Sequence, residues 1–252
     1  MPLQSSRRKY WLMAGTLIAL ALGTRLARAG ADADALWRIV HERCVPDMAL
    51  NDDPLPCAAV DLREGEARGH VILKDRVGAT QFLVIPTARL TGMEDPALLA
   101  ADLPPYLAAA WAAREAVIAA AGGRLAPAAV GLAINAQGQR SQNQLHIHVD
   151  CLRPEVIAAL RDHAIPAGPG WVAFAVPLAG HRYRAHRLSE AALWQANPFR
   201  LLAESVPGQA MGAQSLALVA VPGGLLLLSD HADAAGGGHA EDLQDHGCAV
   251  AH

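Results

Sequence analysis

Residues 143–152, "NQLHIHVDCL", combine two histidines and an acid with three alternating aliphatic residues. The second half of this stretch alternates polar and apolar residues, as a β-strand does when successive side chains point to opposite faces. The alternation predicts that His146, His148 and Asp150 share one face of a strand, while three aliphatic residues share the other. Because buried imidazoles need hydrogen-bond partners, we expect this polar face to line an open pocket.

Short strands and helices are predicted on both sides of this stretch. Strands are expected at 69–75, 80–87, 129–135, 171–178 and 181–187, and a hairpin is expected at 215–230. Helices are expected at 31–44, 104–122, 153–164 and 189–206. The strand–strand–helix–strand–strand order that surrounds the opening stretch predicts an α+β fold with a largely antiparallel sheet and flanking helices.

Two segments lack a periodic pattern. Residues 45–68 indicate a polar loop, and residues 231–247 form a tail rich in Gly, Ala and Asp. Four histidines lie in or after this tail, namely His231, His239, His246 and His252. We expect a disordered polar end on the surface here, rather than a metal site.

The first thirty residues have the pattern of an export signal or a membrane anchor. Basic residues at 7–9 precede an uncharged, mostly apolar run at 11–24, and Ala-Arg-Ala at 27–29 resembles a cleavage site. The run is shorter than the roughly 18 residues typical of a spanning helix, although an uncleaved anchor stays open. We therefore divide the chain into a signal or anchor at 1–30 and an exported folded domain at 31–252.

The four cysteines agree with export, because an even number of cysteines outside the cytoplasm predicts disulfides. None lies in a Cys-x-x-Cys pair. Three pairings are open, and four free thiols are the alternative. We favour Cys44–Cys57, which closes a polar loop, together with Cys151–Cys248, which ties the C-terminal tail to the histidine strand.

Charge and composition narrow the function without deciding it. The 252 residues carry a formal net charge of −3, and 52% are apolar, which is typical of a globular protein without a nucleic-acid footprint. On residues alone, two readings of the histidine strand stay open. His-x-His on a strand can supply two zinc ligands. Alternatively, one imidazole attacks a phosphorus atom and its neighbours position it.

Asn135 and the histidine strand together carry a family resemblance. "LAINAQGQRSQNQLHIHVDCL" (132–152) resembles the histidine-triad (HIT) superfamily, in which a strand ending in Asn precedes a strand of alternating histidines. "QFLVIPTARLTGMED" (81–95) is similar to the strand and turn upstream of that pair. The likeness covers about 70–155 as a motif core and leaves about 156–252 as a C-terminal extension.

A closer likeness runs along nearly the whole chain. It is carried by the N-terminal segment, the Cys44 loop, a late cysteine, "VILKD" (71–75), "LAIN" (132–135), "QNQLHIHVDCLRP" (142–154) and "GHRYRAHR" (180–187). These segments resemble the bacterial CDP-diacylglycerol pyrophosphatase family of membrane-attached HIT relatives. The resemblance implies hydrolysis of CDP-diacylglycerol to CMP and phosphatidate by a periplasmic domain on an inner-membrane anchor.

The resemblance also implies roles for the motif residues. His148 is then the nucleophile and forms a cytidylyl-imidazole intermediate, while His146 orients the strand and contacts phosphate or ribose. Asn135, Ser141 and Asn143 occupy positions that donate hydrogen bonds to phosphate oxygens, which stabilises charge in the transition state. The family's chemistry implies neither a metal nor a cofactor.

Asp150 is a departure from the superfamily pattern, because most members have a third histidine there. That histidine helps the leaving group depart, and phosphatidate is a weakly basic leaving group that needs little help. An ionised Asp150 beside phosphates needs a partner. We expect it to hold a histidine or to accept a bond from Arg153 or Arg140.

Further residues are assigned to substrate binding on weaker grounds, and a solvated strand is the alternative for most of them. These residues are Gln142, Lys74, His181 and Tyr183. Trp171 and Trp194 are expected in the core rather than stacked on cytosine. The expected partners are the lipid substrate and the membrane, with no nucleic acid, and the sequence leaves the oligomeric state open.

Two rival functions remain at this level. A HIT-like hydrolase or transferase could act on soluble nucleotides. A periplasmic metal-binding protein could use His146 and His148, provided that a third ligand comes from a neighbouring strand.

Overall fold

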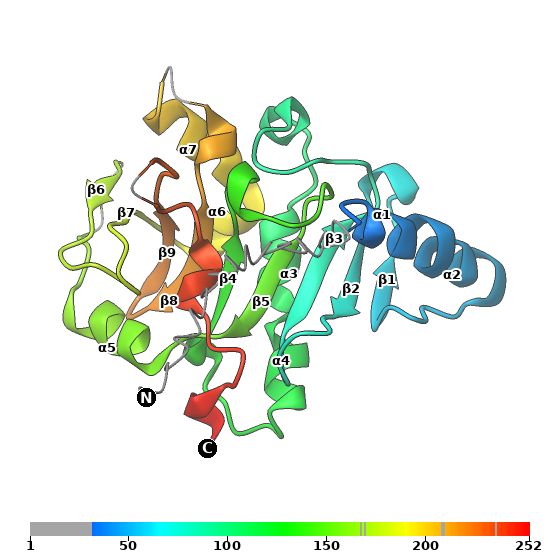
Figure 1. Cartoon of the computed structure of the whole chain (residues 1–252), viewed down its shortest axis with the longest axis horizontal. Helices are drawn as coiled ribbons and strands as arrows, with labels where there is room; N and C mark the ends of the chain where they lie inside the picture. The colour runs from blue at the N-terminus through cyan, green and yellow to red at the C-terminus, as the bar shows by residue number, and fades with distance from the viewer. Residues whose placement is uncertain (1–31, 167, 169, 208–209, 235) are drawn as a thin grey trace, which may run out of the picture. The chain divides into compact units, whose positions relative to one another are not determined.

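The computed structural model describes residues 32–252 except 167, 169, 208–209 and 235. One nine-stranded sheet, flanked by helices on both faces, dominates this part of the chain (Figure 1). The strands lie in the order β1-β2-β3-β5-β4-β8-β9-β7-β6, and all the pairings between them are antiparallel. The α+β fold with an antiparallel sheet is therefore confirmed.

The strands and helices of the described residues have the following bounds. The strands are β1 (Ala59–Asp61), β2 (His70–Lys74), β3 (Phe82–Pro86), β4 (Val130–Ile134), β5 (Ile147–Cys151), β6 (Val172–Ala173), β7 (Arg184–Leu188), β8 (Leu216–Val221) and β9 (Gly224–Ser229). The helices are α1 (Ala35–Ile39), α2 (Val45–Asn51), α3 (Tyr106–Ala112), α4 (Arg114–Ala120), α5 (Pro154–Asp162), α6 (Glu190–Gln195) and α7 (Pro198–Ser205). A π-helical stretch, Val40–Cys44, joins α1 to α2.

The alternation of side chains along the central strands sorts the core into clusters on the two faces. On one face, Ile147 and Val149 of β5 pack in a cluster with residues of α3, α4, α6 and α7. On the other face, a cluster beneath α1 and α2 includes Leu83, and a cluster beneath α5 includes Ala133. His148 pairs across the sheet with both Leu83 and Ala133. The histidine face of β5 therefore lies between two apolar clusters.

Several predicted elements differ from those observed. The predicted helix 189–206 is two helices, because Pro198 cannot continue a helix and begins a new one. The side chain of Asn197 caps α7 by accepting hydrogen bonds from two backbone N–H groups. The predicted helix 104–122 is interrupted at Ala113. The predicted strand 171–178 is reduced to β6, and the predicted polar loop 45–68 contains α2 and β1.

The expectation of a disordered tail was wrong. Residues 236–252, here called the C-terminal segment, cross one face of the sheet (Figure 1) and include the 3-10 turn Ala240–Leu243. Backbone N–H groups of Asp245 and Arg153 donate to Cys151 and Leu243, respectively, at 2.8 and 3.0 Å. Leu243 is buried in the cluster beneath α5. The segment is therefore part of the folded core.

Both favoured disulfides are confirmed, at Cys44–Cys57 and Cys151–Cys248. The first closes a separation of 13 residues and lies in the apolar cluster beneath α1 and α2. The second spans 97 residues and fastens the C-terminal segment to the end of β5. Disulfides of this kind are typical of proteins outside the cytoplasm.

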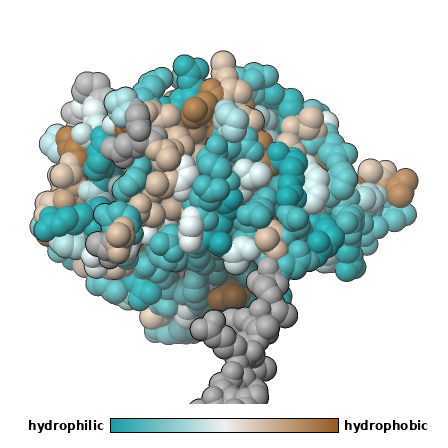
Figure 2. Space-filling model, turned by 45° about the horizontal axis from the view of Figure 1, so that its top comes forward, coloured by the Kyte–Doolittle hydropathy of each residue, from teal (hydrophilic) through white to brown (hydrophobic). Residues whose placement is uncertain are grey.

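The predicted export segment, 1–30, lies outside the described residues. Among the helices that are described, none combines the length and apolarity required to cross a bilayer. Figure 2 shows a mostly hydrophilic face with apolar atoms at its right-hand edge, the side on which α2 lies in Figure 1. Leu50 and Leu55, at the end of α2 and just beyond it, are 82% and 63% exposed.

Candidate active site

His146, immediately before β5, and His148 within it, here called the β5 histidines, lie side by side on one face of the sheet. The ring centroids of His146 and His148 are 4.9 Å apart with an interplanar angle of 63°. Both residues are buried, at 8% and 6% exposure. The expected pocket is polar but not open at the rings themselves, because apolar clusters flank the histidine face and the C-terminal segment crosses it. A cavity of about 540 Å³ is lined by Glu241, His246 and neighbouring residues of that segment.

Glu241 of the C-terminal segment faces the Nδ1 side of His148. Its Oε1 lies 3.1 Å from His148 Nδ1. Asn135, just after β4, donates from Nδ2 to the other carboxylate oxygen at 2.9 Å and accepts from the Glu241 backbone N–H at 3.1 Å. This reciprocal pair fixes the direction in which the carboxylate points.

Asp150 is completely buried and accepts several hydrogen bonds. Thr80 Oγ1 donates to one carboxylate oxygen at 2.7 Å, and His246 Nδ1 lies 2.9 Å from the other. Its ionic partner is thus a histidine. The two arginines considered as alternatives are engaged elsewhere, Arg140 with Glu94 and Arg153 with the backbone of Asp242.

His246 bridges the two carboxylates of the cluster. Its Nδ1 faces Asp150 at 2.9 Å and its Nε2 faces Glu241 at 3.3 Å. These hydrogen bonds, to Asp150 and then to Glu241, raise the pKa of His246 to about 10. Burial raises the pKa of Glu241, but hydrogen bonds from His246, Asn135 and Gln81 outweigh burial and leave this pKa well below its usual value. At neutral pH the cluster holds one imidazolium and ionised Glu241.

The β5 histidines have the opposite tendency. Burial, reinforced by the neighbouring His148, lowers the pKa of His146 to about 4. Burial also lowers the pKa of His148, although Glu241 acts to raise it. His146 Nδ1 lies 2.7 Å from the Gln144 carbonyl, so it carries the ring proton and donates there. Nε2 of His148 is buried and has no hydrogen-bond partner within the described part of the chain.

Gln81, just before β3, completes the surroundings of His148. Its Nε2 lies 2.6 Å from His148 Nδ1 and 3.2 Å from Glu241 Oε1. Sequence reasoning missed four residues of this cluster, namely Thr80, Gln81, Glu241 and His246. The pairing of Cys248 with Cys151 was a usable signal for one of them, because it brings His246 close to Asp150.

The predicted substrate-binding residues are dispersed. Asn135 belongs to the cluster. Ser141 and Asn143 are exposed in the loop before β5. The side-chain amide of Gln142 accepts from the N–H of Leu36 and donates to the carbonyl of Asp32, so it fastens the start of the described chain.

The other three predicted binding residues make no hydrogen bond to the β5 histidines or to Glu241 among the described residues. Lys74 follows Leu73, whose side chain is on the His148 face, and therefore lies on the opposite face, where its Nζ donates to two backbone carbonyls. His181 Nε2 lies 3.2 Å from Asp242. Tyr183 is buried in the cluster beneath α5, its hydroxyl lacks a hydrogen-bond partner within the described residues, and burial raises its pKa.

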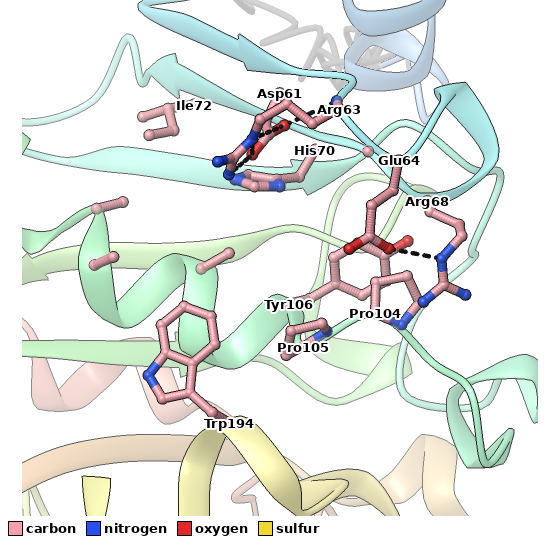
Figure 3. A pocket seen from close by; sticks show the side chains of 14 residues that line it. Asp61, Arg63, Glu64, Arg68, His70, Ile72, Pro104, Pro105, Tyr106 and Trp194 are labelled. Atoms are coloured by element: carbon pink, nitrogen blue, oxygen red, sulfur yellow. Dashed lines mark hydrogen bonds and ion pairs between the residues drawn. The ribbon is translucent and has the colours of Figure 1, made fainter. Parts of the chain in front are cut away.

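A cavity of about 510 Å³ lies on the opposite face of the sheet from His148, between β2 and α3 (Figure 3). Tyr106 and Trp194 line its apolar side, and the ion pairs Arg63–Asp61 and Arg68–Glu64 stand at its rim. Trp194 is 56% exposed, so its expected place in the core was wrong. Trp171 is partly buried against the core, as expected.

A metal site was the rival reading of the histidine strand. Across the described residues, no three His, Cys, Asp or Glu side chains are arranged to hold a metal ion. The Nδ1 atoms of both β5 histidines face protein groups instead.

The two disulfides indicate an extracytoplasmic α+β protein, and the buried cluster of titratable side chains around His148 is typical of an enzyme active site. The model of the family described as CDP-diacylglycerol pyrophosphatase matches residues 31–252. A Yersinia pestis protein described as CDP-diacylglycerol pyrophosphatase is 42% identical over 248 residues, which cover 96% of this chain and 95% of its own. The chain therefore belongs to the CDP-diacylglycerol pyrophosphatase family.

Proposed function

We propose that this protein hydrolyses the pyrophosphate bond of CDP-diacylglycerol and releases CMP and phosphatidate. We further propose that residues 31–252 form a HIT-like hydrolase domain in which His148 is the nucleophile. The observation that carries the mechanism is the state of His148: burial favours its neutral ring, Nδ1 faces a carboxylate, and Nε2 has no hydrogen-bond partner among the described residues. A nucleophile needs a free lone pair, and this arrangement leaves one on Nε2.

In the first step, the lone pair of His148 Nε2 attacks the phosphorus nearer cytidine. An N–P bond forms, and the bond from that phosphorus to the bridging oxygen breaks. Phosphatidate leaves with the electron pair, and its low basicity makes a protonating acid unnecessary. The ring, which keeps its Nδ1 proton, becomes a cytidylyl-imidazolium.

In the second step, water attacks the same phosphorus and the N–P bond breaks. The electron pair returns to Nε2, the water proton is released to solvent, and CMP leaves. His146 donates from Nδ1 to a backbone carbonyl, which leaves its Nε2 as an acceptor for a ribose hydroxyl. Ser141 and Asn143 are exposed in the loop before β5, and in this proposal they donate to phosphate oxygens of the bound substrate.

The location of the enzyme follows from its substrate and its disulfides. The two disulfides favour an oxidising compartment. We propose that residues 1–30 export the chain and anchor it at the inner membrane, with the catalytic domain in the periplasm. The acyl chains of the substrate then stay in the bilayer, and only the headgroup enters the site.

The proposal is tested with purified protein and CDP-diacylglycerol in detergent micelles. CMP and phosphatidate should form in equal amounts, with EDTA present, and His148→Asn should form neither, whereas His252→Asn should match the wild type. In H₂¹⁸O the label should enter CMP and not phosphatidate, because water attacks the cytidylyl phosphorus. Label in phosphatidate would overturn the mechanism. Turnover of a soluble CDP-alcohol but not of CDP-diacylglycerol would overturn the lipid assignment.

A further inference from the structure

We infer that Glu241 and His246 are positioning residues for His148. Glu241 keeps the proton on Nδ1 of His148 and so leaves the Nε2 lone pair free, and His246 holds Glu241 in place by pairing with Asp150 as well. The inference rests on the proposed function, because it states how the nucleophile is prepared for attack.

Two contacts at Nδ1 compete to set the tautomer of His148. Glu241 Oε1, at 3.1 Å from Nδ1, accepts the ring proton if it is there. Gln81 Nε2, at 2.6 Å, favours the opposite tautomer, in which Nδ1 accepts and the proton sits on Nε2. A hydrogen bond to a carboxylate is roughly twice as strong as one between neutral groups. Gln81 Nε2 also donates to Glu241 Oε1 at 3.2 Å, so the amide hydrogens have the same carboxylate as an acceptor, and the Nδ1–H form is favoured.

Two side chains, of Asn135 and His246, hold the carboxylate of Glu241 in place. Asn135 fixes one carboxylate oxygen, and His246 Nε2 approaches the other at 3.3 Å. The same imidazolium meets the completely buried Asp150 at 2.9 Å. A buried carboxylate without a cation is costly, so Asp150 and Glu241 together fix His246 between them. Asp150 thus takes part through His246 where most HIT relatives have a third histidine.

The carboxylate of Glu241 also affects the charge that develops on His148 during the reaction. When the N–P bond forms, the His148 ring becomes positive, and the Glu241 carboxylate lies where this charge develops. Fixed charges of this kind lower the barrier when they need no rearrangement. Several charged or titratable groups act on His148, namely Glu241 and His246 from the C-terminal segment, Asp150 from β5, His146 just before β5, and Asp75 after β2.

The inference is tested on the full chain by ¹⁵N-histidine NMR and by the pH dependence of kcat. Wild-type His148 should show the Nδ1–H tautomer. Glu241→Gln should lower the pKa of His148, since a negative charge is lost, and His246→Asn should raise it, since a positive charge is lost. In a plot of kcat against pH, the fall in kcat at acid pH should shift to lower pH in Glu241→Gln and to higher pH in His246→Asn. Both variants should lose about 10²-fold or more in kcat, with KM within about twofold.

Matched controls are Glu155→Gln, exposed in the first turn of α5, and His252→Asn at the exposed chain end. Both should leave the tautomer, the pKa of His148 and kcat unchanged. An Nε2–H tautomer in the wild type, or shifts of the same sign in both variants, would overturn the inference. NMR needs no turnover, so inactivity toward CDP-diacylglycerol would refute the proposed function while this inference is still decided. If His246→Asn fails to fold, Glu241→Gln and the wild-type tautomer decide it.

Discussion

Strand β5 and the C-terminal segment both supply side chains to the cluster, and they hold those side chains by different means. In β5, antiparallel pairing on both sides sets the direction of every side chain, since His148 is in register with Leu83 and Ala133. The C-terminal segment is instead fastened at separate points, by a disulfide at Cys248 and a backbone hydrogen bond from Asp245. The strand fixes the orientation of the proposed nucleophile, and the segment provides its charged surroundings.

The two regions also hold opposite charge states. Burial keeps the β5 histidines neutral, whereas the carboxylates around His246 keep it protonated. A nucleophilic imidazole must be neutral, and an imidazolium that pairs with carboxylates must be charged. Histidine therefore serves two roles in this protein because the surroundings of His148 and His246 differ.

The largest expected effect lies in β5. His148→Asn should reduce kcat by at least about 10⁴-fold, because it removes the attacking nitrogen. The measurement is CMP release over long incubations at high enzyme concentration. Residual activity within about tenfold of the wild type would contradict a role for β5 as the source of the nucleophile.

The two disulfides should differ in their effect on catalysis, because only Cys151–Cys248 fastens the C-terminal segment. Replacing both Cys151 and Cys248 by Ala should lower the free energy of unfolding by about 5 kcal/mol and reduce kcat by about 10- to 100-fold, because the C-terminal segment is released. Replacing both Cys44 and Cys57 by Ala should cost about 3 kcal/mol and leave kcat unchanged.

Two measurements separate the effect on stability from the effect on catalysis. Urea unfolding gives the free energy of unfolding, and kcat is measured at the same temperature, at which each variant is folded. Equal losses of kcat in the two double variants would mean that the Cys151–Cys248 bond matters only for stability.

The pH dependence of stability should divide between the regions. The folded-state pKa of His146 lies below its ordinary value of 6.5, so its stabilising contribution is present above pH 6.5 and lost as pH falls through about 4, by roughly 3 kcal/mol. The pKa of His246 is raised, so its contribution is present below pH 6.5 and lost as pH rises through about 10. Urea unfolding across pH should show a weaker acid slope in His146→Gln and a weaker alkaline slope in His246→Asn. Parallel curves for all three proteins would refute this division.

The smallest effect is expected outside both regions. The buried hydroxyl of Tyr183 lacks a hydrogen-bond partner within the described residues, so Tyr183→Phe removes an unsatisfied group. The free energy of unfolding should stay equal or rise by about 1 kcal/mol, and kcat should stay within about twofold. A large rise in KM for CDP-diacylglycerol would instead restore Tyr183 to substrate binding.

The sequence predicted β5 well and the C-terminal segment badly, for a physical reason. Alternation has a short period, so ten residues suffice to place His146, His148 and Asp150 on one face. Glu241 meets Asn135 across 106 residues, and His246 meets Asp150 across 96, through a segment without a periodic pattern. Its path depends on Gly236, Gly237 and Gly238, which all have positive φ angles. The Cys248–Cys151 pairing was the one sequence signal that located this segment.

A local sequence signal marks the start of α7. An Asn-Pro pair at 197–198 marks the start of α7, because Asn caps helices and Pro is favoured in the first turn. Nothing local distinguishes Thr80 and Gln81 from other strand-flanking polar residues, because their roles arise only from the pairing of β3 with β5.

The most direct test of the account is to trap the covalent intermediate. Wild-type protein mixed with CDP-diacylglycerol and quenched in alkali within milliseconds to seconds should carry one cytidylyl group on His148, detected by peptide mass spectrometry. The adduct should be acid-labile, as a phosphoramidate is, and Glu241→Gln should form it more slowly on the same residue. Steady turnover with no adduct, or an adduct on another residue, would contradict the claim that β5 provides the nucleophile.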